Sequence, residues 1–172
     1  EYTTTRGDDR RDGLTPATPK ASLRAILTTY DLEPGDTIFL DTGTYSAAVN
    51  ILIAHDDSGL TVQGPTGTAA DGQPHVALIT RGSSSAGAFG FELDDADGVT
   101  LSHISVTGAF HAVHVTRGST AFTLQDSWIF ENADAGVFIA DPASSRARIL
   151  RNVFFGDASD ATCIRSQQGS LA

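Results

Sequence analysis

The feature that most constrains the fold is a set of three segments that repeat one another at a nearly constant interval. GAFHAVHV, NADAGVFI and DASDATCI begin at Gly108, Asn132 and Asp157 and align without gaps, 24 and then 25 residues apart. Gly, Asn and Asp tolerate a left-handed backbone better than other residues do. The alignment therefore predicts one sharp bend in each repeat, with these three residues in one column.

Short apolar strands surround each predicted bend. ISVTG, WIFEN and VFFGD come directly before the bends, and VTL, FTL and ARI come earlier in each repeat. Three short strands in a repeat of about 22 to 25 residues is the period of one turn of a parallel β-helix, and about five turns fit the chain. Sandwich and jelly-roll folds need hairpin turns such as Asn-Gly, which the sequence lacks. The residues predicted to stack inward are Val113, Val137 and Thr162.

One segment has the pattern of an amphipathic helix. In TPKASLRAILTTY, apolar residues recur at helical spacing from Leu23 to Tyr30. Thr18 is placed to cap this helix, and Pro19 suits its first position. We expect a helix over residues 19–30 that covers the apolar lumen and the unpaired strand edges at one end of the solenoid.

The opening segment, residues 7–49, contains the turn GDDRRDG, the following TPATP, the helix, and the motifs PGDTI and GTY. The resemblance of these motifs is to the opening segment of bacterial extracellular right-handed parallel β-helix proteins of the pectate-lyase-like superfamily. It implies a right-handed parallel β-helix and an extracellular or cell-surface location. The superfamily contains polysaccharide lyases, hydrolases and epimerases as well as surface modules without chemistry, so the resemblance does not determine an activity.

Length and charge limit the possible partners. The 172 residues suit one domain, with an N-terminal turn and capping helix at 1–37 and β-helix coils at 38–172. The net charge of −10 and the lack of a basic run argue against nucleic acid and anionic membranes. No apolar run is long enough to insert into a membrane. Because the sequence contains no Met, we expect it to be a fragment of a larger protein.

Three histidines lie close together in the sequence LSHISVTGAFHAVHV. Val113 and Val115 are expected to point inward, so His114 should point outward, while His103 and His111 should lie at bends. A transition metal needs ligands that converge on one ion, which three different directions do not allow. The sequence therefore favours surface histidines over a metal site, although His111 and His114 could together chelate an ion.

A column of outward residues, one from each turn, alternates acidic and basic side chains. Asp95, Arg117, Asp141 and Ser166 follow successive strands at equivalent offsets, which favours a ladder of ion pairs between turns. The alternative is a saccharide site, in which acids and bases on the outer strands grip an acidic sugar or abstract its proton. The candidate catalytic residues of that alternative are Glu92, His114, Arg117, Asp95 and Asp141.

Two acidic clusters could bind calcium, because each supplies several carboxylates in a turn that contains Gly. The first and stronger candidate is GDDRRDG, with Asp8, Asp9 and Asp12, and the second is DDADG at residues 94–98. The competing interpretation is that the short Asp side chains accept hydrogen bonds from backbone donors of their own turns.

We expect a non-catalytic structural or carbohydrate-contacting module, with a polysaccharide as its partner. The alternatives are a polysaccharide lyase or related uronate-active enzyme, and a module that assembles end to end. The sequence after TCIRS shows no capping helix, so we expect an adjoining domain or a second copy to contact the C-terminal end near Ile164.

Overall fold

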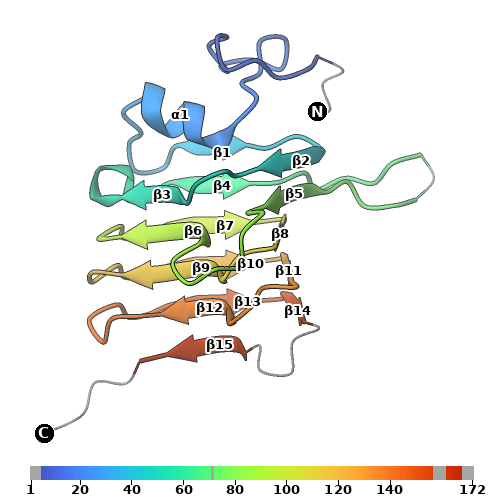
Figure 1. Ribbon diagram of the computed structural model, residues 1–172. Coiled ribbons are helices and arrows are strands. Elements are labelled where there is room, and N and C mark those ends of the chain that lie inside the picture. The colour runs from blue at the N-terminus through green and yellow to red at the C-terminus, as the bar shows by residue number, and fades with distance from the viewer. Residues whose placement is uncertain (1–4, 71, 157–161, 168–172) are drawn as a thin grey trace, which may run out of the picture.

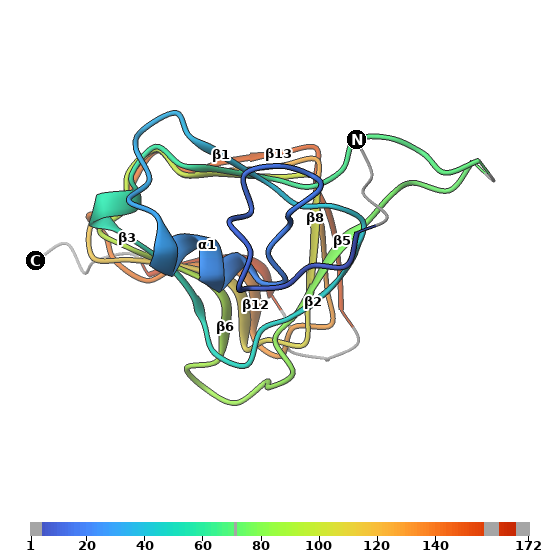
Figure 2. The ribbon, with the colours of Figure 1, turned by 90° about the horizontal axis from the view of Figure 1, so that it is seen from above.

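The computed structural model describes residues 5–70, 72–156 and 162–167. The chain winds through about five turns, and each turn contributes one strand to each of three parallel sheets (Figure 1). Viewed from above, the sheets form three sides of the coil and helix α1 (Leu23–Thr29) lies across one end (Figure 2). The predicted parallel β-helix with an N-terminal helix is confirmed.

Each sheet contains five strands, one from each turn. Sheet A consists of β1 (Thr37–Phe39), β4 (Thr61–Gln63), β7 (Thr100–Ser102), β10 (Thr123–Gln125) and β13 (Arg148–Leu150). Sheet B consists of β2 (Gly43–Ser46), β5 (Ala77–Thr80), β8 (Ile104–Thr107), β11 (Trp128–Phe130) and β14 (Val153–Phe155). Sheet C consists of β3 (Ile51–Ala54), β6 (Phe89–Asp94), β9 (His111–Thr116), β12 (Ala135–Ile139) and β15 (Thr162–Ser166).

The core is a continuous apolar lumen, because alternate residues of each strand point inward. In sheet A, Val62, Leu101 and Leu124 are ladder partners in successive turns and are fully buried. Val113 and Val137 are buried partners in sheet C, as predicted. Each turn therefore covers the apolar residues of the turns above and below it.

Links of one or two residues join sheet A to sheet B in three successive turns. His103, Asp126 and Arg151 occupy these links with φ of 54°, 51° and 53°. Because the strands before them pair in register, these three residues occupy one column. The side chains at this corner also interact, because Arg151 donates to both carboxylate oxygens of Asp126 at 2.6 and 2.7 Å.

The links from sheet B to sheet C differ from the prediction. Gly108 and Glu131 adopt the left-handed conformation, with φ of 70° and 50°, and Asn132 is the residue after that bend. These links have three residues at 108–110, four at 131–134 and six at 156–161, so the bends do not form one ungapped column. The predicted offset of 24 residues holds within the strands, where Ala135 pairs with His111, whereas the offset of 25 for the third repeat is wrong. Asp157, the third residue of the predicted column, lies outside the described residues.

Asn132 stabilises this corner through its side chain. Its Oδ1 accepts from the backbone N–H of Ala109 at 3.1 Å, and its Nδ2 donates to the carbonyls of Val106 and Phe130 at 3.2 and 2.9 Å. The buried amide thus satisfies backbone groups of two turns at the bend.

The longer links also shift the last strand by two residues. Val137 pairs with Ile164, whereas Thr162 pairs with Ala135 and is exposed, so the inward position predicted for Thr162 is wrong. Ile164 is 46% exposed. Because residues 168–172 lie outside the described residues, contact of an adjoining domain or second copy with this end stays a prediction.

The helix is shorter than predicted. It begins at Leu23 rather than Pro19, and its N-cap is Ser22, whose hydroxyl accepts from Ala25 N–H at 3.2 Å. Asp9 fixes the start of the helix by accepting from the backbone N–H groups of Ala21 and Ser22, both at 2.8 Å. Leu23 is buried against the core. Among the described residues, no helix has the length and apolar character required to cross a membrane.

The strands of sheet C bend at a column of small residues. Gly90, Ala112 and Gly136 follow one another in successive turns, between the paired ladder positions. A Cβ atom on Gly90 would lie 2.7 Å from Val106 Cγ1, and one on Gly136 would lie 2.8 Å from Phe154 Cδ1. The column therefore faces the lumen, and the strand residues at 111 and 114, on either side of the bend, both face outward.

Replacing Gly90 by Val should destabilise the protein, because the added side chain would meet the Ala112 carbonyl oxygen 2.6 Å from its Cβ. We expect the free energy of unfolding, measured by urea titration, to fall by about 1–3 kcal/mol. Ser84→Val adds the same side chain at an exposed position and serves as the control. Equal stability of the two variants would contradict the proposed close packing of this column.

Candidate functional site

Two histidines meet on the outer face of sheet C. Because β9 bends between them, His111 and His114 face the same side, with their Nδ1 atoms 2.9 Å apart. The prediction that all three histidines point in different directions is therefore wrong for this pair. It holds for His103, which lies at the corner of sheets A and B with its Nδ1 3.2 Å from Ser102 Oγ.

The hydrogen bonds of this pair determine where its protons lie. His111 Nε2 is 2.7 Å from Asp134 Oδ2, and a carboxylate only accepts, so this nitrogen carries the proton. The Nδ1 of neutral His111 is then an acceptor, and His114 must donate from its own Nδ1. His114 Nε2 is consequently left with a lone pair and, among the described residues, has no hydrogen-bond partner.

Aromatic rings enclose the two imidazoles. Their rings are nearly parallel, at 3° to each other, and both stack on Phe89, with ring centroids 5.0 and 3.9 Å away. Phe138 of the following turn lies against them at an angle of 47° to His111 and 49° to His114. The two imidazoles are therefore packed between Phe89 of the preceding turn and Phe138 of the following turn.

Asp134 is balanced by a cation from the last described strand. Arg165 donates to both of its carboxylate oxygens, at 2.8 Å to Oδ1. The same guanidinium lies over the ring of Phe138, 4.5 Å from the centroid. Arg165 is also the ladder partner of Phe138, a position that the alignment without gaps had assigned to Cys163.

Burial keeps both histidines neutral. It lowers the pKa of His114 to about 4, and the neighbouring His111 lowers it further in the same direction. Burial also lowers the pKa of His111, although the hydrogen bond and charge of Asp134 oppose this shift. At neutral pH the pair therefore carries no charge.

Glu92 lies beside His114 in the ladder of sheet C. Its Oε2 accepts from Asn50 Nδ2 at 2.8 Å. The Oδ1 of Asn50 in turn accepts from Arg81 Nε at 3.2 Å and from the backbone N–H of Phe89 at 2.9 Å. Asn50 thus fixes one oxygen of Glu92, while Oε1 has no hydrogen-bond partner among the described residues.

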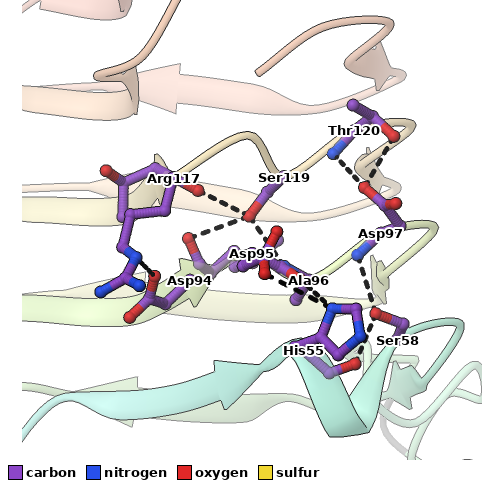
Figure 3. A network of polar contacts seen from close by, with 11 residues as sticks. His55, Ser58, Asp94, Asp95, Ala96, Asp97, Arg117, Ser119 and Thr120 are labelled. Atoms are coloured by element: carbon purple, nitrogen blue, oxygen red, sulfur yellow. Dashed lines mark hydrogen bonds and ion pairs between the residues drawn. The ribbon is translucent and has the colours of Figure 1, made fainter. Parts of the chain in front are cut away.

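The acidic turn after β6 forms a network with the turns above and below it (Figure 3). Arg117 Nε lies 2.9 Å from Asp94 Oδ1, and His55 Nδ1 lies 3.5 Å from Asp95 Oδ2. The structure therefore pairs Arg117 with Asp94 rather than with Asp95.

Hydroxyl groups complete this network (Figure 3). Asp97 Oδ1 accepts from both the N–H and the hydroxyl of Thr120 at 2.7 Å, and these bonds lower the pKa of Asp97. Ser119 and Ser58 accept from the backbone N–H groups of Ala96 and Asp97 at 3.0 and 3.1 Å. The acids of this cluster thus have partners within the protein, as expected for turn formers.

The five candidate catalytic residues fall into three groups. Glu92 and His114 are neighbours on sheet C, whereas Asp95 and Arg117 belong to the acidic turn network. Asp141 stands apart, and its Oδ1 accepts from the N–H of Ala143 in its own turn at 2.8 Å. Its expected neighbour Ser166 instead pairs with Ile139, so that part of the predicted column is wrong.

Several close contacts on sheet C involve residues that were not predicted as catalytic residues, although His111 was considered as a chelator together with His114. These residues are His111, Asp134, Phe89, Phe138 and Arg165. A detectable signal was present in the sequence, because the small residues Gly90, Ala112 and Gly136 recur at the second position of successive strands and mark the bend. In a regular strand, side chains alternate between the two faces, so His111 and His114, three residues apart, would point to opposite faces.

The carboxylates of the first predicted calcium cluster bind groups of the protein. Asp8 Oδ1 accepts from Arg10 N–H at 3.0 Å, Asp9 Oδ2 accepts from Ser22 Oγ at 2.9 Å, and Asp12 Oδ1 accepts from Leu14 N–H at 3.1 Å. Within the part of the chain that the structure describes, no group of three or more His, Cys, Asp or Glu residues is placed to hold a metal ion.

Comparison with known proteins supports the fold alone. No protein-family model and no curated protein sequence matches the chain. A solved structure described as "Crystal structure of pectate lyase Pel9A" is similar over 99% of this chain, with 16% sequence identity and a TM-score of 0.54. The chain spans 55% of the length of that structure. Its fold is therefore a pectate-lyase-like parallel β-helix.

Lowering the pH should destabilise the protein through His114, whose pKa is about 4 in the folded state against an ordinary value of 6.5. Between these values the unfolded chain binds a proton that the folded chain does not, so the free energy of unfolding falls as the pH drops. Urea unfolding at about pH 7 and about pH 5 should show a larger loss for the wild type than for His114→Gln. Equal losses would contradict a neutral, buried His114.

Calcium binding at Asp8, Asp9 and Asp12 stays a prediction. If the ion is held there, a chelator should lower the melting temperature of the wild type but not that of Asp8→Asn, which keeps the turn hydrogen bond while removing a charge. Asp9→Ala is unsuitable because it also removes the contacts that fix the start of α1. A wild-type melting curve that is insensitive to chelator would leave these residues as turn formers.

Proposed function

We propose that the chain is a non-catalytic, carbohydrate-contacting module of an extracellular or cell-surface protein. The contact surface is the outer face of sheet C around Glu92 and His114. The observation that carries the proposal is that these neighbours each present a hydrogen-bond acceptor, Oε1 and Nε2, that is not used by any described residue. Both side chains are partly exposed, so a ligand can reach them.

Two neighbouring acceptors suit hydroxyl donors. Sugar hydroxyls can donate to a carboxylate and to the lone pair of a neutral imidazole, whereas a sugar carboxylate would be repelled by Glu92. The acceptors are also preorganised, because Asn50 holds Glu92 and the chain from Asp134 through His111 holds His114. Preorganisation lowers the entropy cost of binding.

The same face lacks features that a uronate lyase would need. Such an enzyme requires a base near its working pH and a cation that neutralises the sugar carboxylate. His114 is a weak base, with a pKa of about 4. Among the described residues of this face, Arg165 is bound to Asp134, and Arg81 donates to Asn50 and to the carbonyl of Ala48 at 3.0 Å.

The similarity to a pectate lyase keeps lyase activity as the second candidate function. Incubation with polygalacturonate or alginate and calcium, followed by ultraviolet absorbance of the unsaturated product, separates the two candidates. We expect no product. Turnover that is lost in His114→Gln would establish the lyase instead.

Binding should depend on the two acceptors. We expect calorimetric titration with soluble xylan, a hydroxyl-rich polymer, to show binding that weakens about tenfold in His114→Gln and in Glu92→Gln, because each substitution removes or weakens one acceptor. Glu33→Gln makes the same charge change at an exposed position away from this face and should bind as the wild type does. Unchanged affinity in both site variants would contradict sheet C as the contact surface.

A further inference from the structure

The strands of sheet B carry no charged residue, whereas sheet A contains Arg148 and sheet C contains Glu92, Asp94 and Arg165. The full chain has 11 basic and 21 acidic residues, yet β2, β5, β8, β11 and β14 contain no Asp, Glu, Lys or Arg. These strands stack along one side of the coil (Figures 1 and 2). A uniformly uncharged face on so acidic a protein disfavours a charged ligand and favours a neutral one.

The C-terminal half of this face exposes large apolar side chains. Trp128 and Val153 are ladder partners that are 51% and 45% exposed. Phe130 and Phe155 are also partners, stacked at 8° with centroids 5.1 Å apart, and Phe155 is 48% exposed. We call these four residues the sheet B platform. Their inward neighbours Ile129 and Phe154 hold the strands against the core.

Hydroxyl side chains continue the columns of the platform toward the N-terminal turns. Ser105, the ladder partner of Trp128, is buried, so the accessible hydroxyls lie in the neighbouring column. Ser46, Thr80 and Thr107 are partners in successive turns, and the Thr80 hydroxyl donates to Ser46 Oγ at 3.4 Å. The face thus combines aromatic planes with rows of uncharged donors and acceptors.

We propose that the sheet B platform is a second carbohydrate-binding surface, on which ring faces of a neutral polysaccharide stack while its hydroxyls bond to the neighbouring Ser and Thr side chains. This inference rests on the proposed carbohydrate-contacting function and adds a surface and a ligand class to it. Exposed aromatic rings offer a large, rigid contact area at low entropic cost. The apolar residues gather on β11 and β14, with hydroxyl side chains in the preceding turns, so one face offers both ring stacking and hydrogen bonds to a sugar.

Trp128 is the only tryptophan of the chain, so its fluorescence reports directly on this surface. Titration with soluble xylan should shift its emission, whereas polygalacturonate and alginate should not. By calorimetry, Trp128→Ala and Phe155→Ala should each weaken xylan binding about tenfold or more. The matched control is Phe39→Ala on sheet A, which removes a ring that is 73% exposed and should leave the affinity unchanged.

The possible outcomes separate this inference from the proposed function. Binding that survives both platform variants but is lost in His114→Gln would overturn the platform and leave the proposed function in place. Binding of charged polymers alone would also overturn the platform. Binding of none of the three polymers would overturn both. A dimer that Trp128→Ala dissociates in sedimentation, without any xylan binding, would identify a second copy as the occupant and overturn the glycan assignment.

Discussion

The in-register stacking of parallel strands between successive turns governs the rest of this structure. It places a residue of one turn directly over its counterpart in the next, so apolar residues such as Leu101 and Leu124 form a continuous lumen. The same register lines up the outward side chains in columns. An outward residue is therefore surrounded chiefly by its ladder neighbours, and the chemistry of the surface is a property of columns rather than of single residues.

Three ion pairs join charged residues of different turns. Arg151 binds Asp126, Arg117 binds Asp94 and Arg165 binds Asp134, each across one or more turns. Surface pairs of this kind contribute little stability individually, but they occupy the groups that an enzyme would use on an acidic sugar. Among the described residues, the acceptors on sheet C and the uncharged aromatic platform on sheet B are available to a ligand, and both suit a neutral, hydroxyl-rich partner.

The candidate site was only partly predictable. Glu92 and His114 could be placed beside each other because their strands have the same length and register, and the structure confirms this position. The contact of His114 with His111, and of His111 with Asp134, could not be obtained in that way. It depends on a bend at Ala112 and on a four-residue link before β12, and neither follows from strand periodicity.

By itself, the sequence determined the β-helix, the number of its turns, the capping helix and the inward direction of Val113 and Val137, because these depend on periodicity and local propensity. Only the tertiary structure decided which bend residue is left-handed, where β15 pairs and which polar groups meet. Links of three, four and six residues span the same corner, so the register there is set by packing of the turns on one another. The bend in the strands of sheet C is likewise decided by tertiary packing. Val106 and Phe154 approach Gly90 and Gly136 so closely that only a small residue fits there.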